Sequence, residues 1–542
     1  MNQRVYPQFG STERTSKPLS FVTVRYSPEF EHNLATSPCV NNPLNELIVV
    51  DNQANVVHDT LCGALCSGVA RARNDLVVIV HEDVVLLGGW QARFEQSLDA
   101  LERVDPDWCV LGAAGWTRDL KMRGHWSDPH GYFDLLGGQP FAEVSRIDEH
   151  LMVLRRTGAV ALDPLLPSIH NIGQDLANMG HRVGRRSYVI DAPTIHKYAD
   201  ANGSAIGCAS DSPKIRARST LTYKADKSLS DDYLSAKWRL AATPGQSPAP
   251  APVPSPTAHR RTRPGSKPIV LICRGGGGSR LLSQLAQDCG VFLGEELGPA
   301  GDSMQMVHAI YRSVLGKYRY ANVHSRATII AELRDAAATM LAGRGEDHPW
   351  GFKLPESMLL LDEVAAAFPE ARFVHLIRDP LSTTLRRTHM TARLDNQIGQ
   401  TVLKAAYADL GLSASRILTD SPALHMAITT LFQFKLAEAT FTGMGRRQLL
   451  VVRFEDLLDA PDAATRKFRS WLDDMSMTRR ALAALSRRLT ARGHAEREGT
   501  LARVVDPDRA ARDPAAYDEG VAAQVRHLLA PLRDRLGYTG RT

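Results

Sequence analysis

A glycine-rich segment near the middle of the chain has the composition of an anion-binding turn. It reads RGGGGSR from Arg274 to Arg280 and lies between the apolar PIVLIC and the helix-like LLSQLAQDCG. Glycines let a backbone turn tightly and approach an anion closely, and amides at the start of the following helix then bind phosphate. No lysine follows the glycines, so a nucleoside-triphosphate P-loop is not predicted. A tight strand-to-helix turn without a ligand is the simpler alternative.

The segments around this turn predict an α/β domain. The apolar runs at 268–273, 372–377 and 448–454 are typical of buried strands, and helical spacing follows the first and the third. Polar residues fall where these strands end, and open α/β sheets bind their ligands at that edge. We therefore expect a central parallel sheet with a ligand site at the carboxyl ends of its strands.

Three segments of this half, in order along the chain, resemble bacterial sulfotransferases that use 3′-phosphoadenosine 5′-phosphosulfate (PAPS). RGGGGSRLL is similar to the 5′-phosphosulfate loop, WGFKLPESMLLLDEVAAAFPEARFVHLIRDP to the stretch from W-G-x-K-x-P to a strand ending in R-D, and VVRFEDLLDAPDAATRKFRSWLD to the R-[YF]-E-D-L segment. The resemblance implies a P-loop-like sulfotransferase fold with PAPS as sulfuryl donor. We interpret Arg453, Glu455 and Asp456 as an ion-pair network that fixes a strand end near the donor.

The resemblance also implies which residues hold the donor. The 5′-phosphosulfate would be bound by Arg274, Ser279, Arg280 and the amides of Gly275, Gly276, Gly277 and Gly278. Arg378 would hold the 3′-phosphate. Family members usually have a serine at the position of Arg386, so Ser382, Thr383 or Thr384 would supply a hydroxyl instead, or Arg386 would itself pair with the phosphate.

Sulfuryl transfer needs cations that neutralise charge building on the bridging oxygen, and a base for the acceptor's proton. Lys353 stands where related enzymes carry a lysine near the donor sulfate, so the resemblance assigns it to the leaving group. Relatives use His or Glu as the base, and His324 and Glu356 are both candidates. A surface lysine and a structural histidine are the simpler alternatives.

In the N-terminal half, an apolar run ends in His81-Glu82-Asp83. VVIVHEDVVLLGGW (77–90) indicates a buried strand with acidic residues at its end, which are costly there unless paired or bound to metal. Strand-like FVTVRY (21–26) and ELIVVD (46–51), with helix-like LCGALCSGVARA (61–72), predict an α/β domain with a mainly parallel sheet. An exposed acidic strand end is the alternative to a site.

This half resembles glycosyltransferases of the family 2 type, which have the GT-A (Rossmann-like) fold. HEDV is similar to their D-x-D region, RIDEHLMVLRRTG (146–158) to the strand bearing acceptor-side acids, and LPSIHNIGQDLANMGHRVGRRSYVIDAPTIHKY (166–198) to the closing portion with its terminal His. The resemblance implies a nucleotide-sugar donor whose base is bound by Asp51. His81 replaces the first acid of D-x-D, which weakens the implication of a metal.

The same resemblance implies a divalent cation, Mg²⁺ or Mn²⁺, with Asp83 and His196 as its ligands. An inverting transferase needs one carboxylate to deprotonate the acceptor hydroxyl. Asp148, Glu149 and Asp175 are the candidates for this base. We favour Asp175, because it follows an irregular loop where an acceptor could enter.

The composition is that of a soluble, multidomain enzyme. The 542 residues are too many for one core, and 44% hydrophobic with 23% charged residues is ordinary for a globular protein. A net charge of +6 is too small for this length to indicate nucleic-acid binding, and it suits a polyanionic nucleotide donor. Seven irregularly spaced cysteines, a non-apolar N-terminus and no membrane-length apolar run predict reduced thiols, a cytoplasmic location and no integral membrane segment.

A proline- and alanine-rich stretch from Thr243 to Pro268 cannot bury a core and favours extended conformations. The expected domains are a GT-A glycosyltransferase-like domain at 18–240, a linker at 241–267 and a sulfotransferase domain at 268–542. We expect a bifunctional transferase that adds a sugar and a sulfuryl group to a glycan, glycolipid or small-molecule acceptor. The sequence does not indicate its oligomeric state.

Three other functions are alternatives. The first is a sulfotransferase whose N-terminal domain is an inactive acceptor-binding module. The second is a kinase-like nucleotide-binding protein, which the missing Walker lysine opposes. The third is nucleic-acid binding, for which the chain lacks a stripe of aromatic and basic residues.

Overall fold

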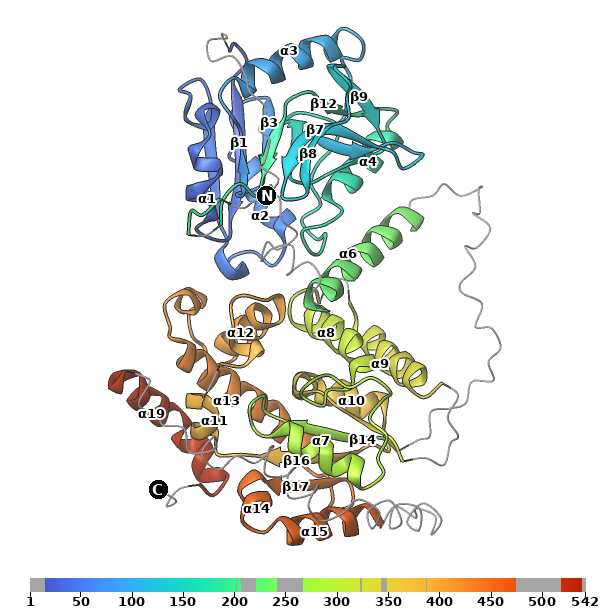
Figure 1. The fold of residues 1–542 in the computed structure, drawn as a ribbon, viewed down its shortest axis with the longest axis vertical. Coiled ribbons are helices and arrows are strands. Elements are labelled where there is room, and N and C mark those ends of the chain that lie inside the picture. The colour runs from blue at the N-terminus through green and yellow to red at the C-terminus, as the bar shows by residue number, and fades with distance from the viewer. Residues whose placement is uncertain are drawn as a thin grey trace. The chain divides into compact units, whose positions relative to one another are not determined.

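The structure is a computed structural model that describes residues 15–200, 202–205, 221–240, 267–321, 324–342, 349–386, 388–473 and 518–538. The chain divides into two compact units, Met1–Thr243 and Pro244–Thr542 (Figure 1). The linker expected at 241–267 lies outside the described residues apart from Lys267, so the expected domain boundaries stay predictions. Both units combine sheets with helices, as the predicted α/β class requires.

The N-terminal unit is built on a seven-stranded sheet. In spatial order it contains β2 (Glu46–Asp51), β1 (Leu19–Arg25), β3 (Leu76–Val80), β11 (Leu151–Arg155), β5 (Leu111–Gly112), β12 (Ser187–Ile190) and β9 (Phe141–Val144). Five of the seven strands run in the same direction, as a mainly parallel sheet requires, whereas β11 runs antiparallel to both neighbours and β9 antiparallel to β12. β11 begins beside the carboxyl end of β3, where the His81 amide donates a hydrogen bond to the His150 carbonyl. From this starting point β11 runs antiparallel to β3.

Side chains of alternate strand residues pack into two hydrophobic cores on opposite faces of this sheet. Leu19 and Phe21 of β1 pack on α3 (Trp90–Glu102), whereas Val22 and Val24 pack on the side of α2 (Leu61–Val69) and α4 (Ile172–Arg182). The long helix α6 (Leu221–Leu240) also belongs to this unit, and the short α1 (Glu29–His32) follows β1. Burial on both faces explains why the strands are continuous apolar runs.

A second sheet lies at one end of this unit. Its order is β10 (Arg146–Ile147), β6 (Ala114–Trp116), β7 (Met122–Asp128), β13 (Thr194–His196) and β4 (Val84–Val85), and β8 (Gly131–Asp134) also pairs with β7. Antiparallel pairing sets His196 of β13 opposite Val84 of β4. This register brings His196 beside the acidic end of β3.

The C-terminal unit has a four-stranded sheet in the order β15 (Gly351–Lys353), β14 (Ile269–Cys273), β16 (Arg372–Ile377) and β17 (Leu449–Arg453). All three pairings are parallel, as predicted. Parallel neighbours need crossover connections, which the helices supply. The carboxyl ends of the four strands therefore share one edge.

Helices surround this sheet (Figure 1). They are α7 (Ser279–Asp288), α8 (Met304–Tyr318), α9 (Arg326–Met340), α10 (Leu361–Ala367), α11 (Pro380–Arg386), α12 (Gln397–Asp409), α13 (Pro422–Phe441), α14 (Phe454–Asp459), α15 (Pro461–Asp473) and α19 (Glu519–Arg535). Short 3-10 turns at Pro355–Leu360 and Met390–Ala392 matter for the site below. Across the described residues of both units, every helix is too short or too polar to cross a membrane.

Candidate functional site

The predicted donor-binding residues of the C-terminal unit meet at one sheet edge. Lys353 ends β15, Arg274 follows β14 and Arg378 follows β16, and these three strands are parallel neighbours. The glycine-rich turn connects β14 to α7 at the same edge. Residues that are far apart in sequence are thus brought together by the strand order β15-β14-β16.

Glycines are required in this turn, because neighbouring atoms leave little space for a Cβ. Gly278 precedes α7 with φ +101, and a Cβ there would lie 2.4 Å from Cδ2 of Phe454. A Cβ on Gly275 would lie 2.1 Å from Cδ2 of His389. One on Gly277 would lie 2.9 Å from the Arg274 carbonyl oxygen and in ordinary contact, at 3.8 Å, with Cβ of Arg378. The backbone of the turn is therefore held against three side chains that come from other elements.

Arg378 lies beside the turn in a cationic setting. Its guanidinium carbon is 4.6 Å from the centre of the Phe454 ring. Burial lowers the pKa of Arg378, and the positive charge of Arg386 lowers it further. A phosphate beside these two guanidinium groups would be attracted to both. The predicted contribution of Arg386 is thus compatible with its position.

The hydroxyl groups that could assist Arg378 lie in α11 and differ in their surroundings. Ser382 is exposed, and the Thr383 hydroxyl donates to the Asp379 carbonyl at 3.1 Å. Thr384 is fully buried, and its hydroxyl has no hydrogen-bond partner among the described residues. Of the predicted substitutes, Thr384 is the one whose hydroxyl is both enclosed and unengaged.

Lys353 reaches the start of α7. Its side chain is 1% exposed, and Nζ donates to Oδ1 of Asp302 at 2.6 Å, to the Ala300 carbonyl at 2.7 Å and to Oγ of Ser279 at 3.3 Å. The ammonium group thus lies at the end of the glycine-rich turn, where the predicted 5′-phosphosulfate site begins. Arg280 is exposed on α7.

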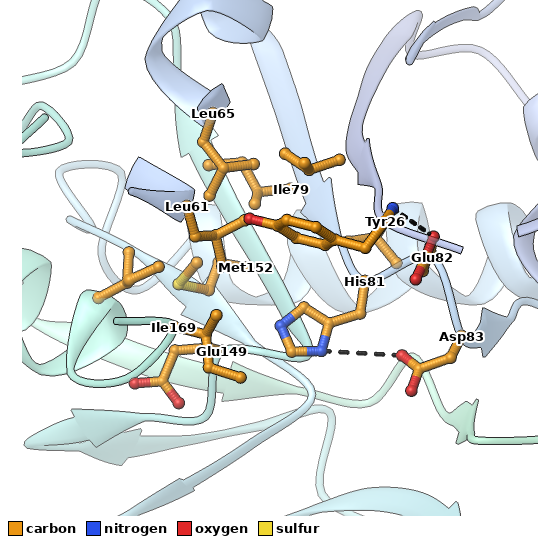
Figure 2. Close-up of a pocket in the computed structure, with 13 residues that line it drawn as sticks. Tyr26, Leu61, Leu65, Ile79, His81, Glu82, Asp83, Glu149, Met152 and Ile169 are labelled. Atoms are coloured by element: carbon orange, nitrogen blue, oxygen red, sulfur yellow. Dashed lines mark hydrogen bonds and ion pairs between the residues drawn. The ribbon is translucent and has the colours of Figure 1, made fainter. Parts of the chain in front are cut away.

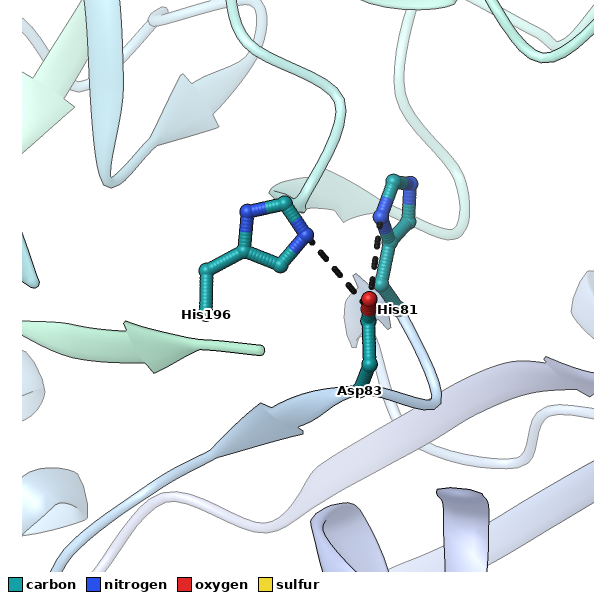
Figure 3. A group of neighbouring side chains, drawn as sticks. All are labelled: His81, Asp83 and His196. Carbon is teal, nitrogen blue, oxygen red and sulfur yellow. Dashed lines mark ion pairs between the residues drawn. The ribbon is translucent and has the colours of Figure 1, made fainter. Parts of the chain in front are cut away.

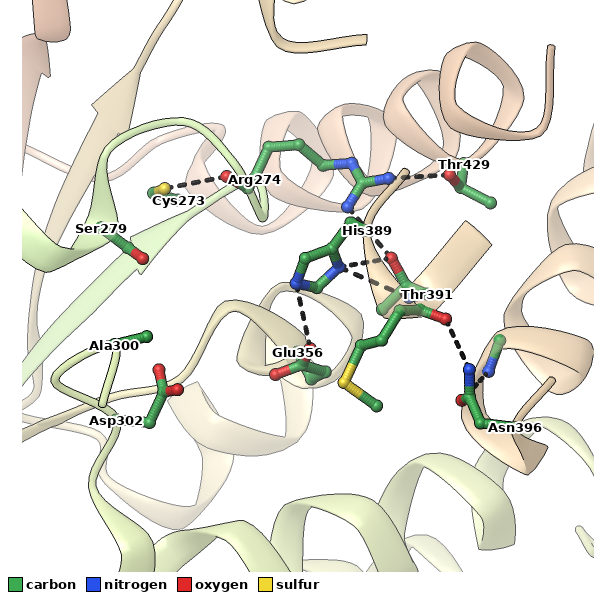
Figure 4. A network of polar contacts seen from close by, with 12 residues as sticks. Cys273, Arg274, Ser279, Ala300, Asp302, Glu356, His389, Thr391, Asn396 and Thr429 are labelled. Atoms are coloured by element: carbon green, nitrogen blue, oxygen red, sulfur yellow. Dashed lines mark hydrogen bonds and ion pairs between the residues drawn. The ribbon is translucent and has the colours of Figure 1, made fainter. Parts of the chain in front are cut away.

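Arg274 is buried and directs its guanidinium toward α13 (Figure 4). It donates to the hydroxyl groups of Thr391 at 3.0 Å, Thr429 at 2.9 Å and Thr430 at 3.1 Å. Burial lowers the pKa of Arg274 to about 10. These threonine contacts were not predicted from the sequence, and the donor-binding role of Arg274 stays a prediction.

The two candidate bases lie in different places. Glu356 is buried, and burial raises its pKa to about 7, with a further increase from the negative charge of Asp302. His324 instead packs between α8 and α9, where its Nε2 is 3.3 Å from Oε2 of Glu332 and its ring covers Gly316. The contacts described for His324 are within this helix pair, so Glu356 is the candidate that the fold brings to the turn.

His389 is a site residue that sequence reasoning missed. Its ring covers Gly275 of the turn, and its Nε2 is 3.5 Å from Oε1 of Glu356 (Figure 4). No motif or periodicity marks this histidine, because its place depends on how the chain turns after α11. The feature of the sequence that could have indicated His389 is its place shortly after a strand that ends in R-D-P.

The residues of RFEDL anchor the C-terminal helix. Glu455 accepts hydrogen bonds from the Asp379 amide at 3.1 Å and the Tyr538 hydroxyl at 2.7 Å, and Arg453 donates to the Leu536 carbonyl at 2.5 Å. The predicted network is therefore corrected, since its described contacts are hydrogen bonds to Asp379, just after β16, and to Leu536 and Tyr538, just after α19, rather than mutual ion pairs. The bond from the Asp379 amide connects Glu455 to the segment just after β16, and the role of this contact in fixing a strand end near the donor stays a prediction.

In the N-terminal unit, a cavity of about 150 Å³ opens at the end of β3 (Figure 2). Apolar side chains that include Leu61, Leu65 and Met152 line one part, and His81, Glu82, Asp83 and Glu149 line the polar part. Glu82 accepts from the amides of Tyr26 at 2.8 Å and Ser27 at 3.1 Å, so it joins the ends of β1 and β3.

His81, Asp83 and His196 converge beside this cavity (Figure 3). Oδ1 of Asp83 is 3.8 Å from Nδ1 of His81 and 3.4 Å from Nε2 of His196. One ligand atom from each of the three lies within 4.8 Å of the others, so they fit a divalent cation. Burial opposes ionisation of Asp83, but the adjacent histidines hold the pKa of its carboxyl below its usual range.

The donor set revises two expectations about the metal. His81 in place of an acid was expected to make a metal less well implied, whereas its imidazole lies with Asp83 and His196 in a group that could hold an ion. Two imidazole nitrogens with one carboxylate suit Mn²⁺ better than Mg²⁺, which prefers oxygen ligands throughout. The cluster thus favours Mn²⁺ over Mg²⁺, and metal binding itself stays a prediction.

The three candidate acceptor-side bases have different surroundings. Asp175 is buried in α4, where Lys237 Nζ binds Oδ2 at 2.7 Å and Trp238 Nε1 binds Oδ1 at 2.9 Å. Both carboxylate oxygens thus contact α6, and Asp175 does not line the described cavity. Our preference for Asp175 is therefore corrected, because α6 covers it.

Of the other two, Glu149 lines the cavity and Asp148 binds a histidine. Burial raises the pKa of Glu149 to about 8, and the charge of Asp148 adds to this increase. Oδ1 of Asp148 is 2.6 Å from Nδ1 of His150. Asp51, the predicted base-binding residue, is exposed at the end of β2 and pairs with Arg25 at 2.5 Å. It does not line the described cavity.

Comparison with known proteins finds a family match in the C-terminal half. Residues 277–475 match the family described as "Sulfotransferase family". The protein "ATP synthase subunits region ORF 6" of Fuscovulum blasticum is 32% identical over 138 residues, which cover 24% of this chain and 54% of that protein. The chain therefore spans about half the length of this curated relative.

Several solved structures are similar at low identity. Sulfotransferase STF9 from Mycobacterium avium has 11% identity and a TM-score of 0.32, over 58% of this chain and 83% of that one. GalNAc-T7 with UDP, GalNAc and Mn²⁺ has 14% identity and a TM-score of 0.24, over 43% of this chain and 52% of that one. These TM-scores are too low to establish a shared fold.

Proposed function

We propose that the C-terminal half, which carries a sulfotransferase family domain, transfers a sulfuryl group from PAPS to a small-molecule, glycan or glycolipid acceptor. The observation that carries this proposal is the meeting of the glycine-rich turn, Lys353 and Arg378 at the carboxyl ends of β15, β14 and β16. Amides of the turn and Ser279 would bind the 5′-phosphosulfate. Arg378, with Arg386 and Thr384, would bind the 3′-phosphate.

The side chains at this edge suit the chemistry of the transfer. An acceptor oxygen or nitrogen attacks sulfur while the bond from sulfur to the bridging oxygen breaks, so negative charge develops on that oxygen. The Lys353 ammonium, 3.3 Å from Oγ of Ser279, would neutralise this charge. Glu356 would take the proton of the acceptor, since burial raises its pKa to about 7 and so suits proton transfer near neutral pH.

Calorimetry with the full chain tests the donor. We expect 3′-phosphoadenosine 5′-phosphate to bind with measurable heat, and ATP to bind much more weakly, because the turn lacks a Walker lysine. Binding of ATP in preference to this nucleotide would contradict the proposal. Turnover of labelled PAPS with extracts of the host, followed by mass spectrometry, would then identify the acceptor.

We propose a second activity for the N-terminal half, the transfer of a sugar from a nucleotide-sugar. The convergence of His81, Asp83 and His196 beside a cavity that also contains Glu149 favours it. These three residues would hold Mn²⁺, which supplies positive charge for the donor diphosphate when it is bound. Glu149 would accept the proton of the acceptor hydroxyl.

Substitution of Asp83 separates this activity from the alternative of an acceptor-binding module. Asp83→Ala removes the carboxylate that lies between the two histidines. Loss of nucleotide-sugar turnover in this variant, with PAPS turnover retained, would support a bifunctional enzyme. An unchanged product would support a sulfotransferase whose N-terminal half binds the acceptor only.

A further inference from the structure

The ring of His389 lies between the glycine-rich turn and Glu356 (Figure 4). Its carbon Cδ2 would be 2.1 Å from a Cβ on Gly275, so only a glycine lets the ring approach the turn so closely. Its Nε2 is 3.5 Å from Oε1 of Glu356. The His389 side chain is 12% exposed and that of Glu356 is 2% exposed, so their contact is largely shielded from water.

The other ring nitrogen of His389 faces Thr391. Nδ1 is 3.1 Å from Oγ1 of Thr391 and 3.4 Å from the Thr391 amide nitrogen. The amide can only donate, so Nδ1 is placed to accept. The hydroxyl group can donate or accept, so its role depends on what else it binds.

Arg274 decides the role of that hydroxyl. Its Nη1 donates to Oγ1 of Thr391 at 3.0 Å, and Nε2 of Gln433 donates to the same oxygen at 3.3 Å. A hydroxyl has two lone pairs and one hydrogen, and an arginine never accepts. The lone pairs of Thr391 are thus occupied, and its hydrogen is directed to Nδ1 of His389. In the neutral ring the proton then belongs on Nε2, which faces Glu356.

We propose that His389 is a positioning residue for sulfuryl transfer, held by Arg274 and Thr391 in the tautomer whose Nε2–H faces the Glu356 carboxylate. With Nε2 3.5 Å from Oε1 of Glu356, the partial positive charge of this N–H favours the ionised form of Glu356, which is the form that accepts a proton from the acceptor. The inference rests on the proposed function for the role of Glu356 in catalysis. The tautomer itself follows from the hydrogen bonds and can be tested alone.

The other groups around Glu356 have opposing effects on its ionisation. Burial and Asp302 favour its protonated form, whereas Lys353 and Arg274 favour its ionised form. The Tyr311 phenol lies near Glu356 on α8 and is itself buried. An N–H donor from His389 adds to the two cations and opposes the effect of burial.

The same geometry opposes His389 as the base. A base at this edge would need an unprotonated nitrogen toward the acceptor, whereas Thr391 occupies Nδ1 and the proton lies on Nε2. His389 therefore acts through Glu356 rather than on the reacting atoms.

Nitrogen NMR of the full chain with ¹⁵N-labelled histidine tests the tautomer without any ligand. The chain has 18 histidines, and the His389 signals are those absent from His389→Gln. We expect Nε2 to be protonated and Nδ1 to be unprotonated in the native protein, and Thr391→Val, which keeps the backbone amide but removes the hydroxyl, to weaken this preference. A native protein protonated on Nδ1 would overturn the proposal.

The pH dependence of PAPS turnover tests the effect on Glu356. His389→Leu removes the N–H, so the rising limb of the rate profile should move up by about one pH unit, with roughly tenfold slower turnover below the limb. His389→Gln can place an amide N–H near the position of Nε2 and should recover most of this loss. An unmoved limb in His389→Leu would overturn the proposed role.

The two proposals fail in different ways. If the native protein binds no 3′-phosphoadenosine 5′-phosphate and turns over no PAPS, the proposed function fails, and the NMR result still decides the tautomer. If PAPS is turned over and the tautomer is the Nδ1–H form, the inference about His389 fails while the proposed function stands.

Discussion

The Cβ atom of Arg378 lies 3.8 Å from the point where a Cβ on Gly277 would stand. Gly277 belongs to the turn after β14, and Arg378 follows β16, more than a hundred residues later in the chain. Parallel pairing of the two strands makes them neighbours. The two groups expected to hold opposite ends of one adenosine nucleotide thus share a sheet edge.

Arg378 is expected to contribute strongly to nucleotide affinity. Arg378→Met removes a charged donor to the 3′-phosphate, which should cost about 2 kcal/mol, or roughly a 30-fold increase in Kd. Isothermal calorimetry with 3′-phosphoadenosine 5′-phosphate measures this. Arg466→Met, at an exposed position of α15, serves as the control and should bind normally. Equal affinities in both variants would remove Arg378 from the site.

A side chain at Gly278 should disrupt the turn. Gly278→Ala meets the Phe454 ring at 2.4 Å and also needs φ +101, so we expect about 3 kcal/mol of lost stability. Gly290→Ala is the matched control, because Gly290 has φ +85 but open space around it, and should cost about 1 kcal/mol. Urea unfolding measures both. The interpretation of a crowded turn is wrong if the two variants lose the same stability.

Lys353 should matter for the transfer more than for binding. Lys353→Met alone would leave Asp302 without its 2.6 Å partner, so the variant to make is Lys353→Met with Asp302→Asn. We expect sulfuryl transfer to fall by roughly 100-fold or more. Binding of 3′-phosphoadenosine 5′-phosphate, which lacks the sulfuryl group, should change little. Asp302→Asn alone is the control, and a double variant with normal turnover would contradict the assignment.

Glu356 should make stability depend on pH. Its pKa is raised from 4.5 to about 7 in the folded state, so the folded chain binds more protons than the unfolded chain between these values. The contribution of Glu356 to the free energy of unfolding therefore falls as the pH rises from 4.5 to about 7. Glu356→Gln should be more stable than the native protein at pH 8, by up to about 3 kcal/mol, with little difference at pH 4.

Urea titrations of both proteins across this pH range give the comparison. Glu370→Gln, at an exposed position after α10, is the control and should keep the native pH dependence. The burial argument for Glu356 is contradicted if its variant follows the native curve.

His81 should be needed for the metal. His81→Ala removes one of three converging ligands and should weaken Mn²⁺ binding by at least tenfold, as judged from the free Mn²⁺ signal in electron paramagnetic resonance. His130→Ala, at an exposed position, is the control. Undiminished binding in His81→Ala would limit the cluster to Asp83 and His196.

Strands such as β1, β3, β14 and β16 were predictable because they are buried on two faces and appear as continuous apolar runs. Their direction was not, since an apolar run has the same pattern whichever way it runs. β11 shows this, for its antiparallel course depends on where the chain enters the sheet beside His81. The second sheet, which places His196 opposite Val84, also depends on long-range pairing.

The sequence by itself determined which chemical groups stand at strand ends, among them the glycine-rich turn, Lys353, Arg378 and Asp83, because residue type and local pattern suffice for that. Only the tertiary structure decided which candidates meet. It covered Asp175 with α6, set His324 between two helices and brought His389 to Glu356. Such contacts arise from helix packing and chain turns between distant segments, so the spacing of residues in the sequence does not predict them.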